Sequence, residues 1–341
     1  MGIKQIAKLA NVSIGTVDRV LHKRPGVSEE TKKRVLQIIK EVDYKKNTMA
    51  SRLKLASVKK IKFAILIPVS KNKWNYWKLP KKGIRKALEE LTELGVTADF
   101  HQFSDTTSFT TLSEDIFSKN YDGIITVAFF EKESNILSEK AREKKIPVVF
   151  LDTEIPLEQE AFFIRQNAHN AGMVAGRLLH GLVGNQGSYF VVNIINHSGI
   201  YANTIQRENG FRAFFDTINE KVDFKTINYT IKDNKFKATK EMKAWFQKDG
   251  LKGIFVTNSK AHFLPAILEE YNITDTFIVG FDLNSQNLKH LKNNKISFLI
   301  NQQPEHQGYM AIKGLFNYLT REDESELSLD IPIEIIVKEN A

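Results

Sequence analysis

From residue 61 to about residue 300, short apolar runs that suit buried strands alternate with stretches whose apolar residues recur at helical spacing. The predicted strands cover residues 61–68, 97–103, 123–127, 148–151, 188–194, 224–230, 253–256, 276–281 and 297–301. The predicted helices lie near residues 84–91, 112–117, 136–141, 171–182, 204–215, 238–246 and 263–271. Alternation of this kind forms parallel sheets flanked by helices. Because a second series begins near residue 171, we expect an α/β fold with two similar lobes.

The first sixty residues hold the whole basic excess of the chain. They contain 15 Lys and Arg against 5 Asp and Glu, whereas the remaining 281 residues contain 34 against 35. A concentrated positive charge beside a neutral remainder is typical of a module that binds a polyanion such as nucleic acid. A solvated basic tail is the alternative, because runs of like charge are often disordered.

Apolar side chains in these sixty residues recur at helical spacing, which argues against a disordered tail. They are Ile3, Ile6, Ala7, Leu9 and Ala10, then Ile14, Val17, Val20 and Leu21, and finally Val35, Leu36, Ile39 and Val42. Ser13 and Ser28 precede the second and third groups and suit helix N-caps, while Pro25 and Gly26 mark a turn. The sequence predicts three short helices, the first two joined as in a helix-turn-helix.

The order of residues in this head is similar to that of the lac repressor (LacI) family of transcriptional regulators. The similar segments are residues 6–21 (IAKLANVSIGTVDRVL), 27–35 (VSEETKKRV), 44–47 and 50–54. The resemblance implies that one face of the second helix meets base edges and phosphates in the major groove. The residues that it places there are Ser13, Ile14, Gly15, Thr16, Asp18, Arg19 and His22, with Ser13 and His22 at phosphate-contacting positions.

Two of these positions depart from the family pattern. Gly15 stands where larger side chains are common and offers no group for base readout, and Asp18 replaces the more usual Ser. A carboxylate near phosphates is repulsive unless it accepts from a cytosine amino group or pairs with Arg19, which itself can read a guanine edge. The sequence therefore predicts DNA binding without predicting which operator is bound.

Residues 47–56 resemble the hinge helix of the family, which implies DNA contacts for Asn47, Ala50, Leu53 and Lys54. This segment is too short to form a stable helix alone, so DNA and a partner subunit would have to order it. Leu53 matches the residue that wedges into the minor groove and kinks the duplex. An ordinary core leucine is the alternative, and Lys46 stands where the family often has Pro.

In open parallel sheets, ligands bind beyond the carboxyl ends of the strands. Here those positions carry aromatic, amide and carboxylate side chains, which suit the apolar faces and paired hydroxyls of a sugar. The candidates are Asn72, Trp74, Trp77, Phe129, Asp152, His197, Asn258, Asp282 and Gln302. Structural alternatives stay open: Trp74 and Trp77 could cover a loop, Phe129 could belong to the core, and Asp282 could be a turn residue.

The same part of the chain resembles the two-lobed (type I) periplasmic sugar-binding fold that the LacI family uses as its effector domain. The similar pieces are residues 149–152, 166–167, 207–211, 279–282 and 302–304. The resemblance adds Arg207 as an effector contact, while Ile205 stands where many members carry a ligand-binding Arg.

The resemblance also implies a division of the chain into domains. We expect a DNA-binding head over residues 1–46, a hinge and linker over 47–60, and an effector-binding and dimerisation domain over 61–341. Its first lobe would combine residues 61–165 with a segment after 302, and its second lobe residues 166–298 with a C-terminal segment.

No pattern for catalysis, a cofactor or a metal site is found. The sequence has no G-x-x-x-x-G-K-[ST], G-x-G-x-x-G, H-E-x-x-H or G-x-S-x-G motif, and it has no cysteine. Its start has no apolar signal-peptide core, and it has no uninterrupted apolar run as long as a membrane helix needs. We therefore expect a cytoplasmic protein that is not an enzyme, requires no cofactor and does not enter a membrane.

These features predict a regulator of the repressor type. We expect a homodimer that binds a pseudo-palindromic site in double-stranded DNA and responds allosterically to a sugar or sugar derivative. A sugar-binding transport protein is the alternative. Such a protein would have to be exported, and it would leave residues 1–56 without a role.

Overall fold

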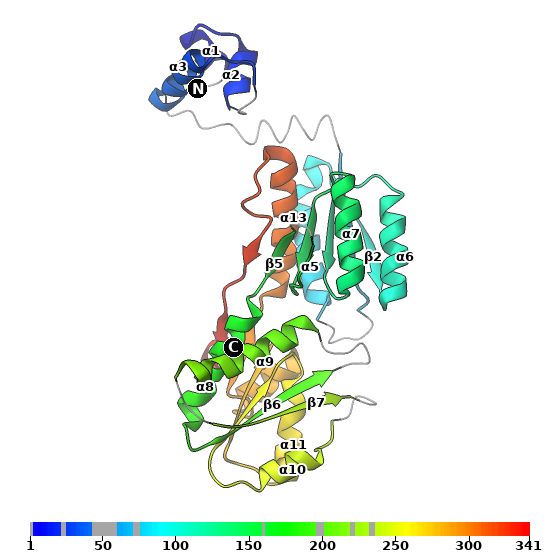
Figure 1. The fold of residues 1–341 in the computed structure, drawn as a ribbon, viewed down its shortest axis with the longest axis vertical. Coiled ribbons are helices and arrows are strands. Elements are labelled where there is room, and N and C mark those ends of the chain that lie inside the picture. The colour runs from blue at the N-terminus through cyan, green and yellow to red at the C-terminus, as the bar shows by residue number, and fades with distance from the viewer. Residues whose placement is uncertain are drawn as a thin grey trace. The chain divides into compact units, whose positions relative to one another are not determined.

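A computed structural model of the chain describes residues 3–21, 25–42, 60–70, 76–158, 161–195, 201–218, 222–231 and 236–341. The chain divides into two compact units, Met1–Lys54 and Leu55–Ala341. Figure 1 shows the helices of the first unit and the two lobes of the second. The predicted hinge helix lies outside the described residues.

The first unit contains α1 (Ile3–Leu9), α2 (Ile14–Leu21) and α3 (Glu29–Glu41). Its small core consists of Ile6, Ala7, Ala10, Val17, Val20 and Val35. Ser28 caps α3 by accepting a hydrogen bond from the Thr31 amide, and Ser13 accepts from the Thr16 amide at the start of α2. Leu9 and Leu36 do not join this core, although they fit the helical spacing: they are 57% and 46% exposed.

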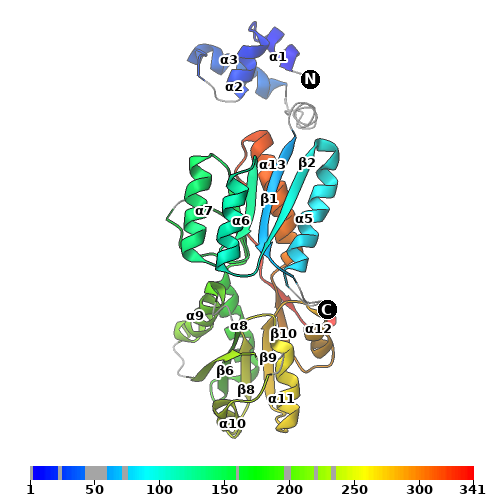
Figure 2. The ribbon, with the colours of Figure 1, turned by 90° about the vertical axis from the view of Figure 1, so that its right-hand side faces the viewer.

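The first lobe of the second unit is a parallel sheet with the strand order β11-β5-β4-β3-β1-β2. Its strands are β1 (Ile61–Pro68), β2 (Val96–Phe103), β3 (Gly123–Val127), β4 (Val148–Leu151), β5 (Phe162–Arg165) and β11 (Leu329–Asp330). Its helices are α5 (Lys78–Leu91), η1 (Thr92–Leu94), α6 (Thr106–Phe117), α7 (Glu131–Glu143) and α13 (Pro304–Arg321). Helices α6 and α7 cover one face of the sheet, and α5 and α13 cover the other (Figure 2).

The second lobe repeats this plan with the strand order β12-β10-β9-β8-β6-β7, in which only β12 is antiparallel to its neighbour. Its strands are β6 (Ser188–Ile195), β7 (Asp223–Thr230), β8 (Lys252–Val256), β9 (Thr276–Phe281), β10 (Phe298–Asn301) and β12 (Glu334–Ile336). Its helices are α8 (Ala168–Val183), α9 (Ala202–Thr217), α10 (Lys240–Phe246), η2 (Ala261–Phe263), α11 (Leu264–Glu270) and α12 (Ser285–Lys292), and η3 (Lys338–Asn340) ends the chain.

Both faces of the second sheet are buried, as the continuous apolar run of β6 predicts. Phe190 and Val192 point to the side covered by α10, α11 and α12, while Tyr189 and Val191 point to the side covered by α8 and α9. Helices α8 and α9 are in close contact at Gly172. A Cβ atom at this position would lie only 2.0 Å from the carbonyl oxygen of Arg207. Glycine at this position therefore fixes how far α9 stands from α8.

The chain passes between the lobes after β5, after β10 and between β11 and β12. The buried side chain of Gln166 holds these three crossings together. Its Nε2 donates to the carbonyl oxygens of Asn301, at 3.0 Å, and Pro332, at 3.3 Å. One amide in the first crossing is thus bonded to the backbone of the other two.

The structure confirms the predicted α/β fold with two lobes, and β1, β3, β4 and β9 begin and end where the sequence places them. Strand β5, helices α12 and α13 and the short strands β11 and β12 were missed. Helix α12 is short and buries Asn287 beside Leu291, whereas α13 buries Ala311, Ile312, Leu315 and Phe316 at helical spacing, so the pattern of α13 was present in the sequence. Among the described helices, none is long and apolar enough to cross a membrane.

Candidate functional site

A cavity of about 750 Å³ lies between the two lobes of the second unit, at the carboxyl ends of their strands. This volume is within the range of small-molecule sites. The first lobe contributes mainly aromatic side chains and one carboxylate, and the second contributes amide, basic and acidic groups. The predicted effector contacts that line the cavity are Trp77, Phe129, Asp152, Arg207, Asn258, Asp282 and Gln302. Asn72, Trp74 and His197 lie outside the described residues.

The side chains of Trp77 and Phe129 line the cavity and also pack against the core of the first lobe. Trp77 is 7% exposed and meets Phe129 edge to face, with ring centroids 5.5 Å apart. Phe129 also stacks on Tyr201 of the second lobe, at 4.3 Å and an interplanar angle of 23°. This stack crosses from one lobe to the other.

Asp152 directly follows β4 and collects donors from both lobes. Its carboxylate accepts from the Tyr76 hydroxyl at 2.6 Å, from Thr153 Oγ1 at 3.0 Å and from Asn203 Nδ2, on α9, at 3.3 Å. Burial, together with the negative charge of Asp152, raises the pKa of Tyr76 well above its usual value. Tyr76 is therefore a neutral donor whose hydroxyl fixes the carboxylate at the cavity wall.

Asp282 follows β9 in the same way, and its carboxylate also lines the cavity. Gln302 Nε2 donates to its Oδ1 at 2.8 Å. Burial and the charge of Asp152 raise the pKa of Asp282, the charge of Arg207 and the hydrogen bond from Gln302 lower it, and the resulting pKa is about 7. The alternative role predicted for Asp282, that of a turn residue, is filled by Asn284, which caps α12.

Arg207 is 3% exposed and is bonded to protein groups on two sides. Its Nη1 donates to the carbonyl oxygen of Thr257 at 2.8 Å, and its Nη2 donates to Gln302 Oε1 at 2.5 Å. The guanidinium carbon lies 3.8 Å from the centroid of the Phe281 ring. Its Nε is buried and has no hydrogen-bond partner among the described residues.

Asn258 lines the cavity, but its amide is engaged with the backbone. Its Nδ2 donates to the Ile194 carbonyl at 2.6 Å, and its Oδ1 accepts from the Lys260 amide at 3.2 Å. Asn258 therefore shapes the loop after β8. The loop presents Lys260, whose pKa burial lowers to about 8, and His262, whose pKa burial also lowers.

The sequence did not single out Tyr201, Asn203, Lys260 or His262, all of which line the cavity. Tyr201 and Asn203 stand at the start of α9, and no periodic pattern distinguishes such positions. Lys260 and His262 follow Asn258 closely, so the rule that ligands bind beyond the strand ends could have found them. Ile205 is 51% exposed, and it is not among the residues that line the cavity.

The wall of this cavity can stack on an apolar ring face and bond to hydroxyl groups. Carboxylates of Asp152 and Asp282 accept hydrogen bonds, and Arg207, Lys260 and Asn203 donate them. Within the described part of the chain, no cluster of His, Asp and Glu side chains is arranged to hold a metal ion.

The first unit presents an exposed surface on α2. Ser13, Ile14, Gly15 and Arg19 are exposed and Thr16 and Asp18 are half-buried, whereas Val17 and Val20 face the core. The Ser13 hydroxyl oxygen caps the start of α2, since it accepts a hydrogen bond from the Thr16 amide at 3.0 Å. His22, Asn47, Ala50, Leu53 and Lys54 lie outside the described residues.

Comparisons with known proteins match both units of the chain. Residues 2–47 match the family described as bacterial regulatory proteins, lacI family, and residues 63–323 match the periplasmic binding protein domain. The protein named as the HTH-type transcriptional repressor ExuR of Bacillus subtilis is 30% identical over 155 residues, covering 45% of this chain and 43% of ExuR. Catabolite control protein A of Streptococcus mutans is 32% identical over 158 residues, covering 46% and 45% respectively. The chain thus spans less than half the length of these curated relatives.

Solved structures extend the likeness to the whole second unit. A crystal structure of a protein assigned as a LacI transcriptional regulator from Bacteroides fragilis has a TM-score of 0.73 at 27% identity, covering 83% of this chain and 98% of that one. The glucose-galactose binding protein GanP of Geobacillus stearothermophilus has a TM-score of 0.65 at 20% identity, covering 83% and 99%. At that identity, the second likeness establishes the fold alone.

Proposed function

This chain belongs to the LacI family of bacterial regulatory proteins, and we propose that it regulates transcription by binding DNA with an affinity that a small sugar-like effector changes. The observation that carries the proposal is the pairing of two sites in one chain. A basic head exposes one face of α2, and a separate unit encloses a cavity of about 750 Å³ between two lobes. We propose residues 1–46 as the head, 47–60 as hinge and linker, and 61–341 as the effector domain.

On the DNA side, exposed Gly15 and Arg19 and half-buried Asp18 stand on the face of α2 that would enter the major groove. Two heads of a homodimer would meet the two halves of a pseudo-palindromic operator. Asn47, Ala50, Leu53 and Lys54 would act at the operator centre, where Leu53 would wedge into the minor groove. The basic excess of the first sixty residues supports this assignment, because phosphate contacts supply much of the binding free energy.

On the effector side, Trp77 and Phe129 offer ring faces, and Asp152, Asp282 and Arg207 offer charged hydrogen-bonding groups. This combination favours a polyhydroxylated ring. Because the cavity is formed by both lobes, an effector bound there would favour one arrangement of the lobes over others. The effector can shift DNA affinity only by as much as its affinity differs between the two arrangements. We propose that the protein acts in the cytoplasm and without catalysis.

The test has two steps. A thermal-shift screen of the full chain against monosaccharides, sugar acids and polyols should find a ligand that raises the unfolding temperature. DNA selected from a random pool should then bind with an affinity that this ligand changes, and deletion of residues 1–57 should abolish DNA binding while preserving the thermal shift. Retained operator binding after the deletion would contradict the assignment of the head.

A further inference from the structure

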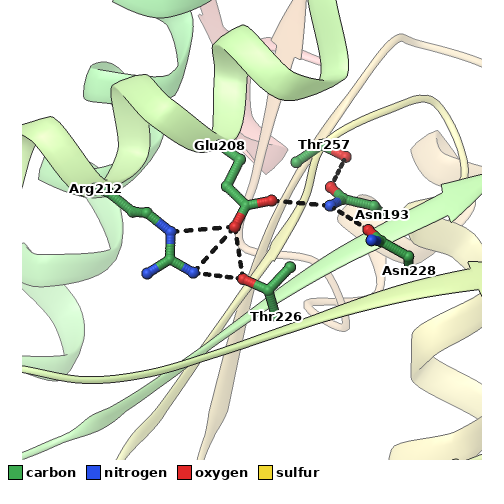
Figure 3. A network of polar contacts seen from close by, with 6 residues as sticks. All are labelled: Asn193, Glu208, Arg212, Thr226, Asn228 and Thr257. Atoms are coloured by element: carbon green, nitrogen blue, oxygen red, sulfur yellow. Dashed lines mark hydrogen bonds and ion pairs between the residues drawn. The ribbon is translucent and has the colours of Figure 1, made fainter. Parts of the chain in front are cut away.

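A network of six polar side chains lies on the second lobe (Figure 3). Its members are Asn193 on β6, Glu208 and Arg212 on α9, Thr226 and Asn228 on β7, and Thr257, which follows β8. We call it the Asn193 network. None of these residues belongs to the candidate effector contacts, and yet the network ends one bond away from Arg207.

The inner half of the network contains two fully buried groups. Asn193 is 3% exposed and Thr257 is 0% exposed. The Thr257 hydroxyl donates to Asn193 Oδ1 at 2.7 Å, and the two hydrogens of Asn193 Nδ2 go to Glu208 Oε2 at 2.9 Å and Asn228 Oδ1 at 2.8 Å. Every hydrogen-bonding atom of the Asn193 amide is therefore used, so this side chain has one fixed orientation.

The outer half holds Glu208 in place. Its Oε1 accepts from Arg212 Nε at 3.1 Å, from Arg212 Nη2 at 3.0 Å and from the Thr226 hydroxyl at 2.7 Å. These donors, together with the bond from Asn193, lower the pKa of Glu208 although burial raises it. The carboxylate is charged at neutral pH and anchors Asn193 from the side opposite to Thr257.

The link to the cavity is the main chain of Thr257. Its carbonyl oxygen accepts the Nη1 hydrogen bond of Arg207, while its side chain is tied to Asn193. The backbone of Arg207 is held as well. Gly172 on α8 packs directly against it, and this contact sets the position of the Arg207 backbone. The backbone of Arg207 and one of the two acceptors of its guanidinium are therefore held by groups outside the cavity, while the second acceptor, Gln302, lines it.

We propose that Thr257 and Asn193 are positioning residues of the effector site, which hold the Arg207 guanidinium in the cavity wall beside Asp282. This inference rests on the proposed effector site but not on DNA binding. If a side chain only stabilised the lobe, its replacement by an apolar one of equal shape would lower the stability of the fold and leave the cavity unchanged. The loss of a positioning residue changes the cavity, because it lets the Thr257 carbonyl move and the guanidinium move with it.

The pKa of Asp282 indicates where the Arg207 guanidinium lies, and it can be measured without a ligand. The charged and titratable groups that act on it are Arg207 on α9, Asp152 after β4 and Tyr76 after β1, and Gln302 is its hydrogen-bond donor. Because the nearby positive charge of Arg207 lowers the pKa of Asp282, movement of the guanidinium away from the carboxylate will raise that pKa.

The experiment follows the Asp282 carboxyl by ¹³C NMR in the full chain labelled at Asp, with Asp282→Asn used to assign the signal. Thr257→Val removes the hydroxyl and keeps the shape. It should raise the Asp282 titration midpoint by about half a pH unit or more. Thr257→Ser retains the hydroxyl and should restore the wild-type midpoint.

The matched control is Thr126→Val in the first lobe, because Thr126 is also 0% exposed and its hydroxyl has no hydrogen-bond partner among the described residues. It should leave the midpoint unchanged. An unchanged midpoint in folded Thr257→Val overturns the proposal, and so does an equal shift in Thr126→Val. If Thr257→Val does not fold, Asn193→Ser decides: a raised midpoint supports the proposal and a wild-type midpoint overturns it.

Discussion

Asp152 and Asp282 have the same backbone conformation at equivalent places in the two lobes. Each directly follows a strand and has a left-handed backbone, with φ of 69° and 68°. Each amide donates to a carbonyl of the neighbouring strand, Asp152 to Ile164 at 3.1 Å and Asp282 to Ile300 at 3.0 Å. Such a conformation costs a residue other than Gly about 1–3 kcal/mol, and Asp is one of the residue types that adopt it more readily than most. Here it accompanies a carboxylate at the cavity wall in each lobe.

The first prediction concerns the stability of the chain against pH. The pKa of Asp282 is about 7 in the folded chain, above the value of about 3.9 for an exposed carboxyl. Between these values the folded state binds more protons, so this group makes the free energy of unfolding fall as pH rises, by at most about 1.4 kcal/mol per pH unit.

We expect Asp282→Asn to lose this decline, so that urea unfolding measured from about pH 5 to about pH 7 gives a flatter profile than the wild type. Asp323→Asn is the control, because Asp323 lies outside the cavity and its pKa is lowered, mainly by the Ser325 hydrogen bond. Parallel profiles for wild type and Asp282→Asn would disprove the raised pKa.

The second prediction concerns the stack between the lobes. Removing either ring of the Phe129–Tyr201 pair should loosen the lobes, since such a pair contributes about 0.5–1.5 kcal/mol beyond its buried area. We expect Phe129→Ala and Tyr201→Ala to broaden the distribution of distances between spin labels placed on the two lobes. Phe130→Ala is the control, because Phe130 contacts Phe103 and Phe109 within the first lobe. An equally broad distribution in that control would count against the stack.

The third prediction concerns the crossings between the lobes. Gln166→Leu removes the donor of the Asn301 and Pro332 carbonyls, and leaving a buried polar group unsatisfied costs about 1–3 kcal/mol. We expect lower stability in urea and faster amide hydrogen exchange in residues 301–303 and in Ile331 and Ile333, which flank Pro332. Gln247→Leu replaces an exposed glutamine of the same lobe and should change neither. Unchanged exchange in Gln166→Leu would show that this side chain does not hold the crossings.

The fourth prediction concerns the DNA face of α2. Arg19→Ala should weaken binding to a selected operator by about 1–3 kcal/mol and relax the preference at one base pair. Lys40→Ala, an exposed change in the last turn of α3, should preserve that preference. Binding is measured by fluorescence anisotropy on selected and on random DNA at the same salt concentration. An equal loss on both DNAs would mean that Arg19 contacts phosphate and does not read a base.

Much of the candidate site could be predicted from the sequence, because carboxyl ends of parallel strands meet at one edge of a sheet. Asp152, Asn258 and Asp282 were found in this way. The groups that these residues contact could not be predicted from the sequence. The amide of Asn258 is hydrogen-bonded to the backbone, and the pKa of Asp282 depends on its burial and on the charges of Arg207 and Asp152, which are distant in sequence.

The sequence alone determined the basic head, the alternation that makes two parallel sheets, and the strand ends from which a cavity is built. These properties are local: charge, periodicity and capping are written in neighbouring residues. Tertiary structure decided the rest, namely the Phe129–Tyr201 stack, the Gln166 bonds across three crossings, and the path from Asn193 to Arg207. Each joins residues far apart in the chain, and polar side chains bonded in this way leave no periodic signal.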